Sequence, residues 1–540
     1  MVSKTASQRA LILQGGGALG AFEIGALKTF CNNLFLEDAK SGLRKNKPLF
    51  DIVAGASIGA VNAAILVDNV IHNENKDLNS EETWKQAIAR LESFYEKISE
   101  RGGHTHPMWW IDNVFLENEL FKSFWAYWEN TKSFLQTQSE SFFNSPIFPN
   151  KATIKEHVAN SPLFSSMYFL FPDTWGKPAS ADLARRYYSY LFSVFWGSPG
   201  VLGPAMIQSD MKFLDPLYFT HLFARFNNNP LVDTMKQFCC KLPLQIKTEK
   251  QDEENHPRLL IISIDVEDIT TPVVFDSFAK KHWDDQDLRR WYSEYGLDSD
   301  GNSKFRIEYD GIEMKHIEAS MATPIRYDYP KFSVVNLSDG KSEERSFWDG
   351  AFLANTPLRQ VMRAYRKYWT EKNVDEIPDL EIFIVNLYPS VESGVPLSPD
   401  SIQDRQIDIT FHDRTKFQVK IDKMRSEYID LLKELVSIAK NRDAEKVDRL
   451  LDQNSSYAGP KDDAFLNKRN ALMKNRFKLG RVVYVEREEK SGNTIFAKAF
   501  DFSPKTIRQL IKEGESRAQD AFVKCTAEYS QTRDVHHDNG

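Results

Sequence analysis

Two consecutive units with the order strand, glycine turn and helix lie near the start of the chain, and they constrain its fold more than any other feature. Residues 10–30 form the first unit, in which a short apolar run leads into Gly15-Gly16-Gly17-Ala18-Leu19-Gly20 and then into helical apolar spacing. Residues 50–67 repeat this order around a turn at 55–59. Units of this kind place their strands parallel in one sheet. We therefore predict an α/β fold with a parallel sheet covered by helices.

The turn of the second unit is Gly55-Ala56-Ser57-Ile58-Gly59, a GxSxG pattern between an apolar strand and a helix rich in Ala and Val. A serine at such a sharp turn exposes its hydroxyl, and the glycines avoid the clash that a Cβ would make with the neighbouring strand or helix. The helix N-terminus adds a partial positive charge beside the hydroxyl. The pattern predicts Ser57 as a nucleophile, with Gly55 and Gly59 forming its elbow.

The turn of the first unit offers backbone N–H groups for an oxyanion hole. Acyl transfer places negative charge on a carbonyl oxygen, and Gly15, Gly16 and Gly17 can approach that oxygen at low steric cost. Gly15, Gly17 and Gly20 also fit the GxGxxG pattern of a nucleotide site, so a nucleotide-binding oxidoreductase is an alternative. A dinucleotide fold would place an acidic residue at the end of the second strand, where this chain has the serine turn. The pairing favours acyl transfer.

A serine nucleophile needs a base, and the 11 histidines of the chain offer no convincing partner. Asp349-Gly350 is the better candidate, because it follows the apolar pair 347–348 and a strand-end aspartate can point into a cleft. The ordinary pKa of an aspartate, about 3.9, makes it a weak base. Asp349 would therefore need either a direct hydrogen bond from Ser57 or a raised pKa.

The glycine-rich turn, the GxSxG turn and Asp349-Gly350-Ala351, in this order, resemble the patatin-like phospholipase family of the bacterial type. The segments 318–324 and 355–357 resemble that family as well, and the likeness covers roughly residues 9–75 and 258–525. It implies a three-layer α/β/α patatin-like sheet. It also implies a Ser-Asp dyad without histidine, which fits the missing histidine partner.

The resemblance further implies a serine esterase that cleaves acyl esters of phospholipids or other lipids through an acyl-enzyme. By that reading Ser57 attacks the ester carbonyl, and Asp349 accepts its proton and later activates water. Gly15, Gly16 and Gly17 hold the oxyanion, and neither a metal nor an organic cofactor is needed. The alternative from another class is a catalytically idle lipid-binding or scaffolding protein on the same fold, against which the intact Ser57 and Asp349 argue.

We predict a catalytic domain formed by residues 9–75 and 258–390. Residues 76–257 form a helical insertion that is crowded with aromatic side chains between 102 and 247. It is interpreted either as a lid or membrane-facing subdomain, or as a subdomain whose aromatics form its own core. Residues 391–529 form a C-terminal extension of helices and strands, and the polar tail 530–540 is expected to be disordered.

The expected partner is a lipid or phospholipid, with association to a membrane surface. The formal net charge of -7 argues against nucleic acid. Residues 415–440 form one predicted helix whose apolar positions alternate in steps of four and three, as in a heptad seam. These positions are Phe417, Ile421, Met424, Tyr428, Leu431, Leu435 and Ile438. The seam is interpreted as packing on its own domain, as a helical hairpin, or as a homodimer contact.

The four cysteines show no metal-ribbon spacing. The apolar run near the N-terminus is too short for a secretory signal, and no stretch of 18 apolar residues occurs in the sequence. We expect a cytoplasmic protein that is peripheral on a membrane.

Overall fold

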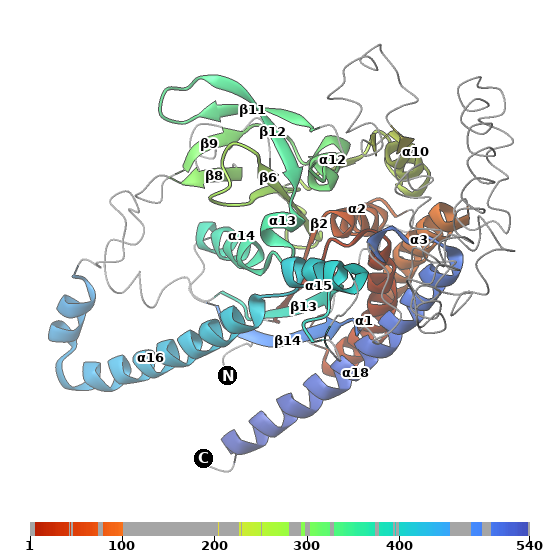
Figure 1. Ribbon diagram of the computed structural model, residues 1–540. Coiled ribbons are helices and arrows are strands. Elements are labelled where there is room, and N and C mark those ends of the chain that lie inside the picture. Colours follow the sequence, from red (N-terminus) through yellow and green to blue (C-terminus); the bar gives the residue numbers. More distant parts are fainter. Residues whose placement is uncertain are drawn as a thin grey trace, which may run out of the picture.

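The computed structural model in Figure 1 describes most of the chain. The described residues are 6–42, 44, 47–73, 79–100, 203–204, 226–227, 229–249, 251–279, 293–297, 303–324, 329–372, 377–391, 395, 399–453, 477–488 and 498–537. Most of the predicted aromatic insertion, at 101–202 and 205–225, lies outside them. Its interpretation as a lid or a separate core therefore stays a prediction.

A mixed sheet of ten strands forms the centre of the described structure. Its order is β14 (Leu479–Glu486), β13 (Leu380–Asn386), β1 (Gln8–Leu13), β2 (Ile52–Ala56), β6 (Arg258–Asp265), β12 (Ser342–Asp349), β11 (Lys331–Asn336), β9 (Ser303–Ile307) and β8 (Ser293–Leu297), and β7 (Val273–Asp276) pairs with β6. The strands from β14 to β6 are parallel, as predicted from the two glycine turns. Those from β12 to β8 are antiparallel, because short connections such as 337–341 allow hairpins and no crossover helix.

Helices cover both faces of the parallel half, which confirms the predicted three-layer α/β/α fold. Alternate strand residues point to opposite faces. Leu11 and Leu13 of β1 face a core shared with α1 (Ala21–Ser41), α2 (Ile58–Ile71), α3 (Glu81–Glu100) and α18 (Pro504–His537). Ala10 and Ile12 face the other core, which α14 (Leu358–Glu371) and α16 (Thr415–Leu451) contribute to.

Shorter elements complete the described chain. They are the 3-10 helices η1 (Gly17–Gly20) and η5 (Lys498–Phe500), the helices α10 (Asn229–Phe238), α12 (Met314–Met321), α13 (Ala351–Ala354) and α15 (Pro399–Phe411), and the strands β3 (Gly203–Pro204), β4 (Phe226–Asn227), β5 (Gln245–Ile246) and β10 (Ile312–Glu313). No helix within the described ranges is long and apolar enough to span a bilayer.

The C-terminal helix α18 packs closely along α1. A Cβ added at Gly25 would lie 1.9 Å from Ile511 O, and one added at Gly514 would lie 2.0 Å from Phe22 O, so only glycine permits this approach. α18 continues through His537, whereas the sequence analysis expects a disordered tail from residue 530. Residues 526–537 are polar but contain neither Gly nor Pro, and extending an existing helix is far easier than starting one.

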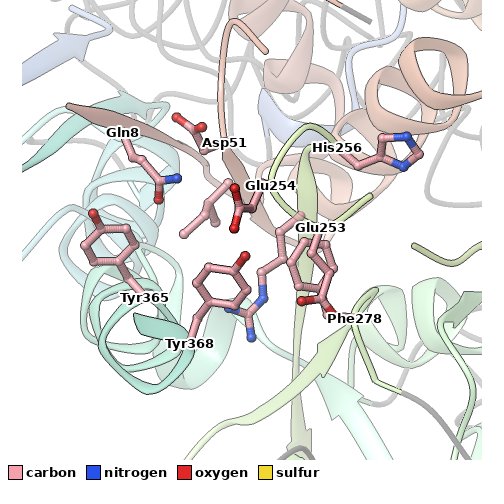
Figure 2. Close-up of a pocket in the computed structure, with 10 residues that line it drawn as sticks. Gln8, Asp51, Glu253, Glu254, His256, Phe278, Tyr365 and Tyr368 are labelled. Carbon is pink, nitrogen blue, oxygen red and sulfur yellow. The ribbon is translucent and has the colours of Figure 1, made fainter. Parts of the chain in front are cut away.

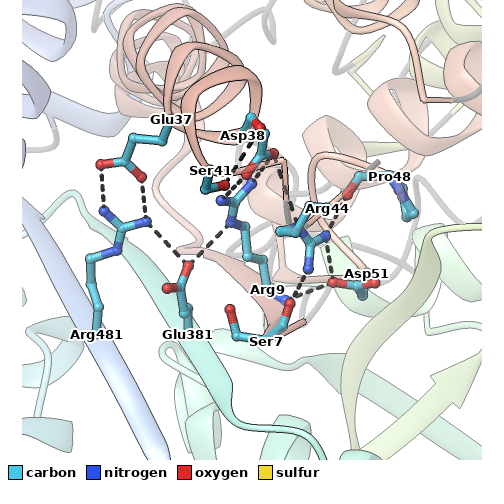
Figure 3. A network of polar contacts seen from close by, with 10 residues as sticks. All are labelled: Ser7, Arg9, Glu37, Asp38, Ser41, Arg44, Pro48, Asp51, Glu381 and Arg481. Carbon is cyan, nitrogen blue, oxygen red and sulfur yellow. Dashed lines mark hydrogen bonds and ion pairs between the residues drawn. The ribbon is translucent and has the colours of Figure 1, made fainter. Parts of the chain in front are cut away.

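A network of buried ion pairs joins the parallel strands to α1 (Figure 3). Arg9 of β1 pairs with Asp38 at 2.6 Å and with Glu381 of β13 at 3.1 Å. Arg481 of β14 shares Glu381 at 3.2 Å and pairs with Glu37 at 2.8 Å. Removing Asp38 or Glu381 would leave the buried guanidinium of Arg9 with fewer counter-ions, which is destabilising. The network thus holds the late strand β14 in register with the first strand of the chain.

The predicted seam on α16 faces away from the body of the protein. Val419 is buried against the core on the α14 side of the sheet. Six of the seven seam residues are at least 48% exposed: Phe417, Met424, Tyr428, Leu431, Leu435 and Ile438. The interpretation that the seam packs on its own domain is therefore wrong for these six. The homodimer contact and the helical hairpin stay predictions.

Candidate active site

Ser57 sits where β2 ends and α2 begins, in a backbone conformation that a residue with a side chain rarely adopts. Its φ is 55° and its ψ is -128°. The Ser57 N–H donates to Ser320 Oγ at 3.0 Å, and the Ser320 hydroxyl donates to Ile262 O at 2.6 Å. This chain of hydrogen bonds from α12 and β6 holds the turn in its strained shape, which points the Ser57 side chain away from the helix axis.

The two glycines of the GxSxG turn allow a close approach of three backbone segments. A Cβ added at Gly55 would lie 2.2 Å from Gly59 O, and a Cβ added at Gly59 would lie 2.5 Å from Leu13 O. Any other residue at either position would push α2 away from the ends of β1 and β2. The glycines therefore fix the position of the serine relative to the first glycine turn.

Asp349 lies at the end of β12 and is 3% exposed. Its Oδ1 accepts the Ala351 N–H at 2.9 Å, and its Oδ2 accepts the Thr323 hydroxyl at 3.3 Å. Burial raises the pKa of this carboxyl to about 6, and the hydrogen bonds from Ala351 and Thr323 and the nearby Ser57 hydroxyl oppose the rise. The structure thus brings Ser57 to Asp349, although β2 and β12 are far apart in sequence.

The hydroxyl of Ser57 also lies 4.0 Å from Met321 Sδ, a weak acceptor at the end of α12. His316, on the same helix, is buried and accepts the Glu313 N–H at 2.9 Å through Nδ1. Burial lowers the pKa of His316 to about 3. A histidine that is neutral and engaged in capping a helix is a poor candidate for the base.

The first glycine turn lies close both to Ser57 and to the turn that follows Asp349. A Cβ added at Gly15 would lie 2.6 Å from Ser57 Cβ and 3.0 Å from Ala351 Cβ. The Gly15 N–H donates to Asn355 Oδ1 at 2.7 Å. This amide is therefore already hydrogen-bonded, whereas the sequence predicts that all three glycines donate to the oxyanion. Within the described part of the chain, the N–H groups of Gly16 and Gly17 have no hydrogen-bond partner, so these two amides are available to a ligand.

The C-terminal segment supports the same turn, a contact that the sequence pattern does not reveal. Gly17 has a φ of 56°, and a Cβ there would lie 2.3 Å from Ala499 O of η5. The neighbouring Lys498 is buried and pairs with Asp404 at 3.1 Å and Asp408 at 2.8 Å, both on α15. Ser320, Thr323 and Asn355 were likewise missed as functional residues. The first two lie inside the small-residue segment 318–324, and Asn355 opens the segment 355–357, so family likeness was the available signal.

A pocket lies at the other end of the parallel strands, at the start of β1 and β2 (Figure 2). Gln8, Asp51 and Tyr368 line it together with Arg258. The guanidinium of Arg258 lies 5.0 Å from the ring centre of Phe278 and 6.0 Å from that of Tyr368. The aromatic rings of the pocket are therefore already engaged in cation–π contacts with this side chain. No group of His, Cys, Asp or Glu in the described chain is arranged to hold a metal ion.

Comparison with known proteins agrees with this geometry. The model of the patatin-like phospholipase family matches residues 11–362. The match runs from β1 into α14 and includes the glycine turn, Ser57 and Asp349. No curated protein matches the chain. Because the family match covers more than half of the sequence, and the serine and aspartate turns lie within it, this chain belongs to the patatin-like phospholipase family.

Proposed function

We propose that the protein is a lipid acyl-hydrolase in which Ser57 and Asp349 form the catalytic dyad. Membership of the family supports lipid acyl-ester hydrolysis in general. The observation that carries the dyad is the buried carboxylate of Asp349, whose pKa burial raises to about 6, together with the close approach of the Ser57 and Ala351 side chains around Gly15. A carboxylate with this pKa is ionised at neutral pH and is a stronger base than an exposed aspartate.

In the first half-reaction, Ser57 Oγ attacks the ester carbonyl while its proton passes to Asp349. The carbonyl oxygen becomes an oxyanion, which the N–H groups of Gly16 and Gly17 stabilise. Such donors are aimed at charge that develops only in the transition state, and each one typically contributes about 10²- to 10³-fold in rate. The tetrahedral intermediate collapses, the ester C–O bond breaks, and Asp349 returns the proton to the departing alcohol.

In the second half-reaction, water attacks the acyl-enzyme. Asp349 accepts a proton from that water, a second oxyanion forms at the glycine amides, and the Ser57 ester bond breaks. The proton on Asp349 then returns to Ser57 Oγ, and the acyl group leaves as a free acid. Every step uses groups of this chain, substrate and water.

The strained turn supports catalysis over the alternative of an idle lipid-binding protein. A non-glycine residue held in a sparsely populated backbone region costs about 1–3 kcal/mol. Ser57 occupies such a region, with a φ of 55°. A protein that only bound lipid would gain stability from glycine at this position. The conformation is explained by the need to present a hydroxyl at the end of the sheet.

A fluorophosphonate probe combined with a phospholipid hydrolysis assay tests the proposal. The probe should label the wild-type protein at Ser57, and Ser57→Ala should neither label nor release fatty acid. Ser93→Ala, which changes a half-buried serine of α3 away from the site, is the matched control and should behave as wild type. Labelling of Ser57→Ala, or fatty-acid release by it, would contradict the assignment. Assays on phospholipid and triacylglycerol in parallel would separate phospholipase from lipase activity.

A further inference from the structure

Another pocket lies between α14, α16 and the start of β14. It is lined by Met362, Arg366, Asp422, Arg425, Ser426, Ile429, Phe477 and Leu479. Leu479 is the first residue of β14 and pairs with Leu380, the first residue of β13, whereas Ser57 follows the last residue of β2. Because these strands are parallel, the pocket and the dyad lie at opposite ends of the sheet. The pocket is therefore separate from the candidate active site.

Two arginines line this pocket, and one of them lacks a counter-ion. Arg366 of α14 has neither an ion pair nor a hydrogen bond with any residue that the structure describes, and its Nε is buried. Burial, together with the neighbouring charge of Arg425 on α16, lowers the pKa of Arg366. A guanidinium that is partly withdrawn from water without a compensating partner is unfavourable. The surroundings of Arg366 would therefore be improved by a bound anion.

The carboxylate of Asp422 does not supply that anion. Its Oδ2 accepts Gln418 Nε2 at 2.7 Å, and its Oδ1 lies 3.4 Å from Arg425 Nη1. Asp422 is thus engaged by its own helix, and no ion pair joins it to Arg366. Among the lining residues that the structure describes, two guanidiniums and one carboxylate leave one excess positive charge.

The remaining features of the pocket fit a phosphate group. A guanidinium binds phosphate oxygens through two parallel N–H groups. A tetrahedral phosphate has enough oxygens to meet guanidiniums from two different helices, whereas one guanidinium fork occupies both oxygens of a carboxylate. Half of the lining is apolar, which strengthens the attraction between opposite charges: Met362, Ile429, Phe477 and Leu479. The pocket encloses about 320 Å³ up to its mouth, which accommodates a small phosphate ester.

We propose that this pocket binds the phosphate group of a soluble phosphate ester or of an anionic phospholipid, held between Arg366 and Arg425. The phosphate provides the counter-ion that Arg366 lacks in the described chain, and it joins α14 to α16. Since the pocket lies at the end of the sheet opposite Ser57, the ligand does not compete with an ester at the dyad. The inference goes beyond the proposed hydrolase and does not depend on it.

Titration of the full-length protein with inorganic phosphate tests the site, at an ionic strength held constant with chloride. Phosphate should raise the melting temperature of the wild type above its value in chloride alone, because a ligand that binds only the folded state stabilises it. Arg366→Gln should weaken phosphate binding about 10- to 100-fold in calorimetry, since a hydrogen-bonded charge pair is lost. Arg363→Gln is the matched control, because Arg363 is exposed on the same helix and does not line the pocket.

Arg366→Met supplies a readout that misfolding cannot mimic. Without phosphate this variant should melt at a higher temperature than the wild type, because it removes a partly buried charge that lacks a counter-ion. It should also lose the stabilisation by phosphate. The inference is overturned if phosphate stabilises the wild type no more than chloride does, if Arg363→Gln loses as much affinity as Arg366→Gln, or if Arg366→Met melts below the wild type without phosphate.

Flotation with phosphatidic acid vesicles distinguishes the two sources of phosphate, performed in the Ser57→Ala background so that the vesicles stay intact. If the source is a lipid headgroup, the parent should float more than its Arg366→Gln variant, and free phosphate should release it from the vesicles. If both float equally or neither floats, while free phosphate still binds at Arg366, the ligand is a soluble ester. Because none of these measurements needs turnover, a protein that binds phosphate but hydrolyses no ester would refute only the proposed function.

Discussion

The substitution Asp349→Asn should abolish hydrolysis and stabilise the protein at neutral pH. Asparagine retains an oxygen that can accept the Ala351 N–H, which donates to Asp349 at 2.9 Å, but it carries no charge to bury. It cannot take a proton from Ser57. Loss of activity alone would also follow from misfolding, whereas a gain in stability together with lost activity identifies a buried catalytic carboxylate.

The size of the gain follows from the raised pKa. The shift from 3.8 to about 6 corresponds to about 3 kcal/mol at 1.36 kcal/mol per unit. Since the folded-state pKa lies above the unfolded one, the protonated carboxyl favours folding fully below about pH 3.8, and this contribution is lost as pH rises through about 6. The uncharged variant avoids that loss. Its advantage should therefore be about 3 kcal/mol near pH 7.5 and about 1 kcal/mol near pH 4.5.

Chemical denaturation of wild type and Asp349→Asn at these two pH values measures the difference. Asp265→Asn is a matched control on the neighbouring strand β6, where the carboxylate is fully buried and pairs with Arg345 at 2.8 Å. That variant should lose stability at neutral pH, because the buried guanidinium of Arg345 loses its fully buried carboxylate partner and keeps the half-exposed Glu343. If Asp349→Asn is less stable than wild type near pH 7.5, or if its advantage does not shrink at low pH, the reasoning about the buried carboxylate is refuted.

Four further outcomes follow from the same contacts. Ester hydrolysis should decline as pH falls through about 6, because Asp349 becomes protonated there, and a pH–rate profile checks this. Ser57→Gly should be about 1–2 kcal/mol more stable than Ser57→Ala in denaturation, since glycine tolerates the positive φ at no cost. Lys498→Met should lose about 3–5 kcal/mol of stability and most activity, because two buried carboxylates of α15 lose the ammonium that they share beside the glycine turn; unchanged melting would contradict this. If α16 mediates a homodimer, Leu431→Glu with Leu435→Glu should reduce self-association in sedimentation velocity, and a wild-type monomer at every concentration would exclude the dimer.

The half of the fold nearest the nucleophile could be predicted from local patterns. The glycine turns lie between apolar runs, and each run is a strand of the parallel sheet because both of its faces are covered. The antiparallel half was not predicted. Strand β12 begins with Ser342, Glu343 and Glu344 at an exposed end and shows no sustained apolar run, so its place in the sheet depends on pairing with β11 and β6.

The candidate site, like the fold, could be predicted from the sequence only in part. Ser57 and Asp349 stand out in the sequence because nucleophile and base require particular residue types beside glycine. The hydrogen bonds of Asn355 with the first glycine turn and of Ser320 with the nucleophile turn join segments that are far apart in sequence. A serine or asparagine in a loop gives no local sign of such a contact. The pKa of the base depends on burial, which also appears only in the folded chain.

The end of the family match at residue 362 does not mark the end of the structure that supports the site. β14 extends the sheet beside β13, and η5 lies so close to Gly17 that a Cβ there would be 2.3 Å from Ala499 O. Lys498 of η5 neutralises the inner face of α15, and α15 is tied to the first glycine turn through Asn355. One buried lysine therefore links helix α15 to the loop proposed to hold the oxyanion. Since these contacts are formed by residues beyond 362, a protein truncated there would keep Ser57 and Asp349 but lose the surroundings that position them.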